Sequence, residues 1–335
     1  MSNQAQYVTG AVAAAGVVGG IYCAYQVYQS RKNKLPEKWT QVGTLQNLYA
    51  YPVKSCAPVV LDRAECSILG LKDGWLRDRT LMIVDEKSNF VTARVIPELL
   101  LIKTNVRNSI LTLSHVDMEP LHIDLAEVVA LKEAKPAFVW GVKVPVRDCG
   151  WEASEWLSRL INKSSISYRL VYYASQNCRS PRNLPNHKYY KFTKNDMGAL
   201  PDEVPFNLIN EASIDDLNTR LSDCKVTHKN FRPNFVLIGT AKPYDEDNWK
   251  FVKIGENVLF EIIKPCTRCI LTTIDPETGV RNAKTEPLET LKSYRQIKDL
   301  EVRKSAGNSP RMGLQMALRS GPGEVVSIND PIYVA

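Results

Sequence analysis

Short strand-like runs separated by turn residues recur along most of this 335-residue chain. The segment RTLMIVDEKSNFVTAR (79–94) has two such runs around turn residues 85–89, and LLLIKTNVRNSILTLSHV (99–116) has its turn at 107–109. Apolar and β-branched runs broken by Asp, Asn and Ser are typical of antiparallel hairpins. Both segments therefore predict hairpins, and their repetition favours a β-rich fold.

Two helices and a long loop interrupt the strand pattern. Apolar residues at helical spacing predict a helix in GWEASEWLSRLINKS (150–164). Ser213, with Asp216 three residues on, has the form of a capping box that begins a second helix. The polar, weakly periodic stretch 175–203 is expected to be a loop that joins two lobes. Further strands are expected at 43–53, 168–173, 232–240, 257–263, 269–275 and 324–334.

These patterns predict an α+β, β-rich fold with two β-barrel-like lobes and a few helices, preceded by an N-terminal membrane anchor helix. At 335 residues the chain exceeds one average domain. We expect the anchor and its basic flank at 1–34, a first barrel-like domain at 40–170 and a second at 171–335. The sequence lacks the glycine-rich fingerprints of Rossmann and P-loop nucleotide sites.

The N-terminal segment predicts the anchor. Residues 1–30 contain no charged side chain and are long enough to cross a bilayer, and the basic sequence RKNK (31–34) follows. A secretory signal would have its basic residues before the apolar run, whereas basic residues after a span keep the downstream chain on the cytosolic side. A buried core helix is the alternative.

The sequence KPCTRC places Cys266 and Cys269 beside Arg268. One such pair supplies two of the four ligands that a structural zinc site needs. A redox-active disulfide is a second possibility, because basic neighbours make a thiol reactive, although that motif usually precedes a helix rather than a strand. A soft metal held by a single thiolate, with its other ligands supplied by a cofactor, is the third.

Basic residues at strand boundaries predict a phosphate-bearing ligand. Lys54 and Ser55 follow one strand-like run, Arg79 stands at the start of another, and Arg232 precedes a proline. Ammonium, hydroxyl and guanidinium groups at such turns can hold phosphate oxygens. The net charge of +7 also suggests an anionic ligand, although a solvated turn cation is the ordinary explanation for any single residue.

Six ordered motifs, from residue 51 to residue 295, carry a resemblance to a known family. They are YPVKSC (51–56), LRDR (76–79), VTAR (91–94), NFRPN (230–234), CTRCILTTIDPETG (266–279) and EPLETLKSYR (286–295). Together they make the chain, from about residue 43 to its end, resemble the mitochondrial amidoxime-reducing components. These are membrane-anchored enzymes of the molybdenum cofactor sulfurase C-terminal (MOSC) superfamily.

The resemblance implies a molybdenum cofactor, Mo-molybdopterin, and assigns roles to residues. It implies that Cys269 is the metal ligand and catalytic residue, with Cys266 a neighbouring thiol that does not ligate. The implied cofactor-binding residues are Lys54, Ser55, Arg79, Arg232, Thr267, Arg268 and Cys269. Asp202, Glu203, Val204 and Met316 depart from the family pattern and are left out of this set. The sequence does not name a proton donor: Asp148 is a possibility, but a structural role at a strand end is the favoured interpretation of this residue.

The implied activity is reduction of N-hydroxylated compounds such as amidoximes, hydroxylamines and N-oxides. The resemblance implies electrons from cytochrome b5 and NADH-cytochrome b5 reductase, and an anchor in the mitochondrial outer membrane with the catalytic part facing the cytosol. No nucleic-acid partner is expected. Two other functions stay open: a carrier of the molybdenum cofactor that takes part in sulfur transfer, and a membrane-tethered binding module whose Cys266 and Cys269 form a redox switch.

Overall fold

The computed structural model describes residues 35–161, 167–180 and 188–335. Residues 40–335 form one compact unit. The predicted anchor at 1–34 lies outside the described residues. Among those that are described, no helix combines the length and the apolar character needed to cross a bilayer.

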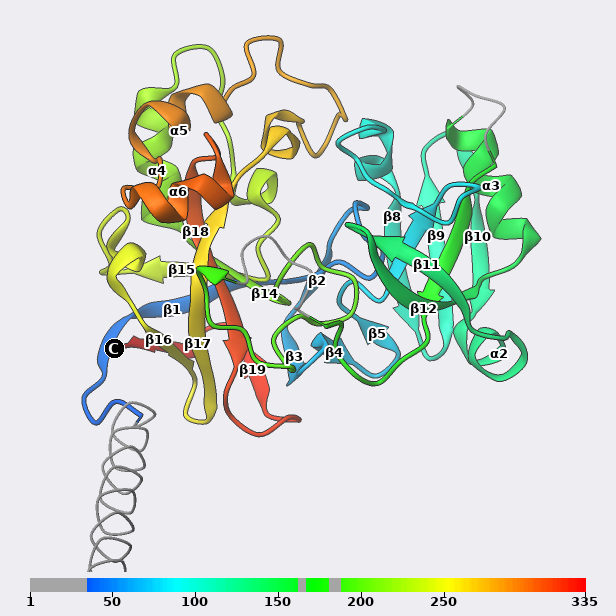
Figure 1. Cartoon of the computed structure of the whole chain (residues 1–335), viewed down its shortest axis with the longest axis horizontal. Coiled ribbons are helices and arrows are strands. Elements are labelled where there is room, and N and C mark those ends of the chain that lie inside the picture. The colour runs from blue at the N-terminus through cyan, green and yellow to red at the C-terminus, as the bar shows by residue number, and fades with distance from the viewer. Residues whose placement is uncertain (1–34, 162–166, 181–187) are drawn as a thin grey trace, which may run out of the picture. The chain divides into compact units, whose positions relative to one another are not determined.

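A closed barrel forms one lobe of this unit (Figure 1). Around it the strand order is β15-β14-β18-β17-β16-β20-β1, and β1 pairs with β15 to close the ring. The strands are β1 (Thr40–Ala50), β14 (Phe206–Asn210), β15 (Phe235–Gly239), β16 (Phe251–Ile254), β17 (Val258–Thr267), β18 (Arg311–Leu318) and β20 (Pro331–Val334), while β2 (Val59–Leu61) extends from β1.

The barrel closes because its interior is packed and its seam is narrow. Phe206, Phe235 and Phe260 are fully buried, and their ring centroids lie 4.9 to 5.9 Å apart. At the seam between β1 and β15, a Cβ atom on Gly43 would stand 2.1 Å from the Ile238 carbonyl oxygen. The close approach of these two strands therefore requires glycine.

Open sheets form the second lobe. A five-stranded sheet has the order β11-β12-β13-β6-β7, and β10-β9-β8 is a three-stranded sheet beside it. The five are β11 (Lys135–Val139), β12 (Val142–Asp148), β13 (Arg169–Tyr173), β6 (Leu81–Val84) and β7 (Phe90–Val91), and the three are β8 (Lys103–Arg107), β9 (Ile110–His115) and β10 (Met118–Asp124). A third sheet, β19-β3-β4-β5, packs against the core of the closed barrel instead, and comprises β3 (Arg63–Ser67), β4 (Gly70–Asp73), β5 (Leu76–Arg77) and β19 (Val325–Ser327).

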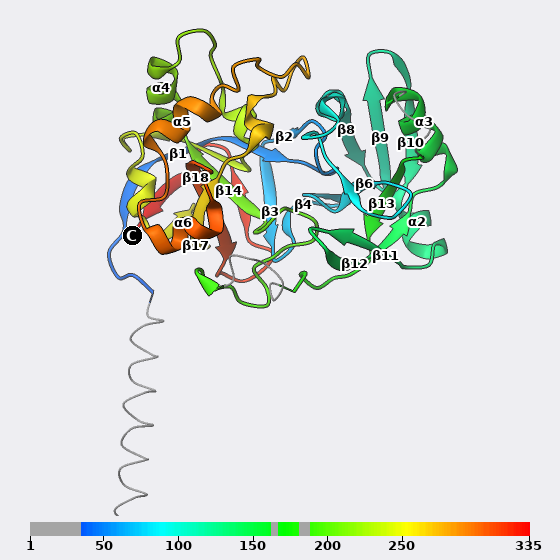
Figure 2. The same ribbon diagram turned by 45° about the horizontal axis from the view of Figure 1, so that its top comes forward.

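The helices lie on the outside of both lobes. Figures 1 and 2 both show α4 (Glu211–Arg220), α5 (Leu288–Tyr294) and α6 (Leu300–Ala306) gathered beside the barrel. In the second lobe, α2 (Leu125–Leu131) follows β10, and α3 (Trp151–Ile161) packs Trp156 and Leu157 into the core. Short 3-10 helices are η1 (Pro97–Leu101), η3 (His228–Phe231), η4 (Asp245–Asn248) and η5 (Ile270–Thr273).

The predicted β-rich fold is confirmed, as are both hairpins (β6–β7 and β8–β9) and the helix α3. The second lobe is a half-barrel rather than a second closed barrel. The edge strand β7 is only two residues long, and in the described chain the backbone pairing between the two edges of its five-stranded sheet is one isolated bridge, between Asn89 and Phe138. The predicted division into domains at 40–170 and 171–335 stays a prediction. Strand β1 belongs to the first of these ranges but pairs with β15 and β20 of the closed barrel.

Two local predictions are wrong. Helix α4 begins at Glu211 with Asn210 as its N-cap, so Ser213 lies inside the helix, where its hydroxyl donates to Glu246 (2.7 Å). The expected strand at 269–275 is instead the 3-10 helix η5. Its predecessor β17 ends at Thr267, because the last pair of its ladder joins Thr267 to Arg311, the first residue of β18. One residue beyond that pair the Arg268 N–H still donates to the Pro310 carbonyl (2.7 Å), and from Ile270 the chain follows η5.

Candidate functional site

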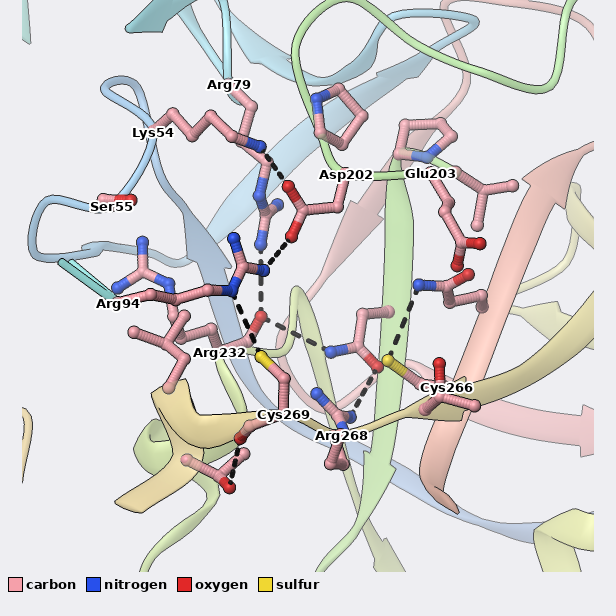
Figure 3. A pocket seen from close by; sticks show the side chains of 18 of the residues that line it. Lys54, Ser55, Arg79, Arg94, Asp202, Glu203, Arg232, Cys266, Arg268 and Cys269 are labelled. Carbon is pink, nitrogen blue, oxygen red and sulfur yellow. Dashed lines mark hydrogen bonds and ion pairs between the residues drawn. The ribbon is translucent and has the colours of Figure 1, made fainter. Parts of the chain in front are cut away.

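All seven predicted site residues line one cavity of about 570 Å³ where the barrel meets the half-barrel (Figure 3). The turn after β1 supplies Lys54 and Ser55, and the turn after β5 supplies Arg79. Arg232 comes from the end of η3, and Thr267, Arg268 and Cys269 come from the end of β17. The fold thus brings together groups that lie up to 215 positions apart in the sequence.

Cys269 stands between the end of β17 and η5, in extended backbone. The Nε of Arg94 donates to its sulfur at 3.2 Å, and the same guanidinium pairs with Asp202. Burial works to lower the pKa of Arg94, but Asp202 and Cys269 outweigh it and raise that pKa. A permanent positive charge therefore touches the sulfur.

Cys266 occupies a different setting, within β17 itself. Its thiol is buried, and Gln315 Nε2 lies 3.6 Å from its sulfur. Burial raises the pKa of Cys266 against the opposing influence of Arg268 and Lys264. Cys266 is therefore the less reactive thiol by environment, in line with its expected role as a bystander, which stays a prediction.

Asp202 links the predicted phosphate-binding lysine to the guanidinium beside Cys269 (Figure 3). Lys54 Nζ lies 2.5 Å from one carboxylate oxygen of Asp202 and donates to the Leu200 carbonyl at 2.9 Å. Burial lowers the pKa of Lys54 to about 8 despite that carboxylate. Burial opposes ionisation of Asp202 too, yet Lys54 and Arg94 together hold its pKa well below the usual range.

Arg79 and Arg232 stack on Tyr51. Their guanidinium carbons lie 4.6 and 4.2 Å from the centre of the Tyr51 ring. Arg79 is held by Asp78, at 2.5 Å, and donates to the Arg232 carbonyl (3.2 Å), while Arg232 donates to the Cys56 carbonyl (2.8 Å). The stack fixes two cations side by side at the cavity wall.

Arg268 is tied to the barrel more than to the cavity. Its Nε and Nη1 donate to the carbonyls of Met312 (2.7 Å) and Phe231 (2.8 Å), and its Nη2 lies 3.3 Å from Asn207 Oδ1. These three contacts come from β18, η3 and β14. Arg268 therefore braces the segment that presents Cys269.

Backbone strain is concentrated at the cavity. In the described part of the chain, nine residues other than glycine have a left-handed φ. Four of them line this cavity, namely Ser55 (74°), Arg79 (48°), Trp140 (52°) and Arg232 (52°). Such conformations disfavour residues with a side chain and persist where the surrounding structure enforces them, often at functional sites.

Sequence reasoning missed three residues at the centre of the site. Arg94 stood in the quoted motif VTAR, and Asp202 was set aside as a departure, so both left a signal. Trp140, whose Nε1 donates to Asp202 (3.1 Å), left none. Met316 is fully buried in the barrel core, and Asp148 ends β12 and accepts from the Gly150 backbone nitrogen, so neither lies among the cavity residues.

In residues 35–161, 167–180 and 188–335, no three His, Cys, Asp or Glu side chains gather in a way that could hold a metal ion. The cavity lining brings together the thiols of Cys269 and the more buried Cys266, an ammonium group and several guanidinium groups. This set matches a soft metal carried by an anionic, phosphate-bearing cofactor.

The sequence matches two family models, the MOSC N-terminal beta barrel domain over residues 42–164 and the MOSC domain over 195–333. It is similar to mitochondrial amidoxime-reducing component 1 of Homo sapiens, with 39% identity over 92% of this chain and 87% of that protein. For component 1 of Mus musculus the identity is 40% (88% and 83% covered), and for component 2 of Bos taurus it is 37% (88% and 83% covered).

The sequence matches extend over most of this chain and over most of each relative. Both matched domains lie within the compact unit that forms the cavity. The chain therefore belongs to the family of mitochondrial amidoxime-reducing components, built from a MOSC N-terminal β-barrel domain and a MOSC domain.

Proposed function

We propose that the protein is a molybdenum-cofactor-dependent reductase of N-hydroxylated compounds, namely amidoximes, hydroxylamines and N-oxides. The observation that carries the proposal is the placement of the Cys269 sulfur, in contact with Arg94, in a cavity lined with cations. The relatives are named for amidoxime reduction, and the MOSC domain is a molybdenum-cofactor-binding kind of domain.

The residues present fit such a cofactor. Cys269 is the proposed thiolate ligand, and the remaining metal ligands belong to the cofactor. Lys54, Ser55 and Arg79 are proposed to hold its phosphate and pterin, with Arg232 stacked beside Arg79. Guanidinium and ammonium groups are the usual partners of phosphate oxygens.

Bound in this cavity, the cofactor would supply two-electron chemistry at the N–O bond. For an amidoxime the balance is one N–OH group, two electrons and two protons in, and one amidine N–H and one water out. Asp202 remains ionised near neutral pH because its pKa is held low, so its part is to orient Arg94 and Lys54 rather than to donate a proton. Arg94 keeps a fixed positive charge beside the sulfur.

The electrons are proposed to come from cytochrome b5 and NADH-cytochrome b5 reductase. The relatives are named mitochondrial. We place this protein in the mitochondrial outer membrane, anchored through residues 1–34 with its catalytic part facing the cytosol. Removal of residues 1–34 should release the protein from isolated outer membranes into the soluble fraction, and retention of the truncated chain would contradict the anchor.

The test uses the full-length chain, purified in detergent from a host that makes the molybdenum cofactor. We expect molybdenum and pterin at about one per chain, and reduction of benzamidoxime to benzamidine when cytochrome b5, its reductase and NADH are added. Zinc or no metal, with a titratable Cys266–Cys269 disulfide, would replace the proposal with a redox switch. Stoichiometric molybdenum without turnover, even with a chemical reductant, would point to a cofactor carrier.

A further inference from the structure

A second pocket, of about 410 Å³, adjoins the cavity. Its lining is largely apolar and aromatic, with Phe90, Val95, Ile96 and Tyr168 on its walls. Pockets of this size and character are typical of small-molecule sites, in which a few polar groups fix the orientation of an otherwise apolar ligand.

Arg94 and Trp140 line both spaces. The Nε of Arg94 contacts the Cys269 sulfur at 3.2 Å, so a side chain that lines the second pocket also touches that sulfur. A molecule whose reacting group lay beside Cys269 could thus extend into the second pocket. The two spaces together form a charged cavity next to a smaller, largely apolar pocket.

Trp140 is placed in this wall against its own conformational preference. It is the first residue of the two-residue turn between β11 and β12, with φ of 52°, and Gly141 follows with φ of 76°. Left-handed angles at both positions define a type I′ turn, which favours Asn-Gly and disfavours a large side chain at the first position. The Trp140 side chain is also 52% exposed, so neither the turn nor the hydrophobic core accounts for tryptophan here.

Contacts hold the Trp140 ring at the boundary between the two spaces. Its Nε1 donates to Asp202 (3.1 Å), the Arg94 guanidinium lies 5.3 Å from its ring centre, and the Phe90 ring is tilted against it with centres 5.0 Å apart. The indole is therefore ordered and partly exposed, as an aromatic binding platform must be.

We propose that the second pocket binds the aromatic substituent of the substrate, with Trp140 as the platform that positions its N–OH group toward Cys269. The occupant is a flat aryl group attached to the reacting amidoxime carbon. Phe90 and Tyr168 offer further ring contacts. This inference rests on the proposed function and names the substrate class that the same site favours: aryl amidoximes over small alkyl ones.

The test compares benzamidoxime with acetamidoxime, which has the same reacting group without the ring, on the full-length, molybdenum-loaded protein. Binding is measured by calorimetry without an electron donor, and KM and kcat are measured with one. In the variant Trp140→Asn the platform is removed and the turn receives its preferred residue, so the protein should fold. We expect the Kd and the KM for benzamidoxime to rise about tenfold, which corresponds to the loss of one good aromatic contact. The Kd and the KM for acetamidoxime should rise by a severalfold smaller factor.

Two further variants make the result specific. Trp140→Phe keeps a ring but loses the hydrogen bond to Asp202, and it should retain most of the affinity for benzamidoxime. Trp151→Ala is the matched control, because Trp151 is 69% exposed and belongs to neither pocket lining, and it should behave as wild type.

Equal losses for both amidoximes in Trp140→Asn, or no loss for either, would overturn the inference. So would weaker binding of benzamidoxime than of acetamidoxime by the wild-type protein. Ring-dependent binding that disappears in Trp140→Asn, in a protein that reduces neither compound, would support the aromatic pocket while the proposed reductase function failed.

Discussion

Two arginine–carboxylate clusters in this molecule use the same chemistry for different ends. Arg295 pairs with Asp247 through two hydrogen bonds of 2.6 and 2.8 Å, and Arg311 adds a third contact at 3.1 Å. The side chains of Arg295 and Asp247 are only 6% and 12% exposed, and neither residue lines the two pockets described above. All three guanidinium nitrogens of Arg295 are directed at protein acceptors, namely Asp247 and the Arg311 carbonyl.

The Arg94–Asp202 cluster instead lies open to the cavity, with the Asp202 side chain 36% exposed. It combines a lysine whose pKa is lowered to about 8, a carboxylate and a sulfur contact. The closed cluster joins η4 to α5 and β18 and serves the fold, whereas the open one keeps charged groups available to a ligand. Exposure to a cavity, more than the identity of the pair, separates a functional cluster from a structural one.

The sharpest way to break this comparison is to remove the sulfur from the open cluster. Cys269→Ser should reduce benzamidoxime turnover to below about one hundredth of wild type, because the proposed metal ligand is lost. Cys266→Ser, the matched control three residues away, should keep much of the turnover. Molybdenum content and circular dichroism are recorded for both variants. Comparable losses in two folded, metal-loaded variants would contradict the division of roles between the thiols.

Neutralising the carboxylate of each cluster should separate stability from function. Asp247→Asn leaves the buried Arg295 and the partly buried Arg311 without their counter-charge and should lower the free energy of unfolding by about 3 kcal/mol. Asp202→Asn should cost about 1 kcal/mol or less, because its side chain is partly solvated, yet it should lower turnover more than Asp247→Asn does. Urea unfolding measures the effect on stability and steady-state kinetics the effect on turnover. A larger loss of stability in Asp202→Asn, or a larger loss of turnover in Asp247→Asn, would contradict the assignment of one cluster to the fold and the other to the site.

Arg79 tests whether the cavity cations act in binding. Arg79→Ala should lower molybdenum and pterin occupancy about tenfold, since a charged hydrogen-bond donor is lost, while turnover per bound cofactor changes less. Arg159→Ala is the control, because Arg159 is an exposed arginine, 69% accessible, on the outside of α3. Full occupancy in Arg79→Ala would remove Arg79 from the proposed phosphate site.

The smallest expected effect is a dependence on pH. Inorganic phosphate should bind the cofactor-free protein through protonated Lys54, so its affinity should fall severalfold as the pH rises through about 8. Lys54→Met should flatten the profile measured by calorimetry between pH 6.5 and 9, and exposed Lys284→Met should leave it unchanged. An unaltered slope in Lys54→Met would assign the titration to another group.

Lys54 and Asp202 both make the folded state more stable as the pH rises, but in two separate pH ranges. The pKa of Lys54 is about 8 in the folded protein against 10.5 for the ordinary side chain, so the unfolded chain binds the proton more tightly between these values. Stability from Lys54 therefore rises with pH across that window. The pKa of Asp202 is lowered on folding, so its contribution is present above its ordinary value of 3.8 and is lost as the pH falls further.

Local sequence signals predicted elements whose partners are adjacent in the chain. The β8–β9 hairpin and helix α3 depend on turn residues and periodicity within fewer than twenty positions, and both form as expected. Where a distant partner decides the outcome, local reasoning failed. Ser213 resembles a helix cap, but its hydroxyl bonds Glu246, and the apolar run after Cys269 leaves the sheet where β18 begins.

The candidate site divides in the same way. Lys54, Arg79, Arg232 and Cys269 could be selected from the sequence because turn cations and a paired thiol are visible as residue types at strand boundaries. The Asp202 carboxylate that joins Lys54 to Arg94, the contact of Arg94 with the sulfur, and the place of Trp140 could not. Such contacts depend on the three-dimensional paths of strands far apart in the chain.

By itself, the sequence determined a β-rich chain with cations at its turns and two thiols of which one was the better candidate. Only the tertiary structure decided that the barrel closes between β1 and β15, that seven distant residues share one cavity, and that Arg94 stands against Cys269. The physical reason is range. Backbone propensity and turn chemistry act over a few residues, whereas the pairing of strands and the shift of a pKa are set by whichever groups the fold brings within a few ångströms.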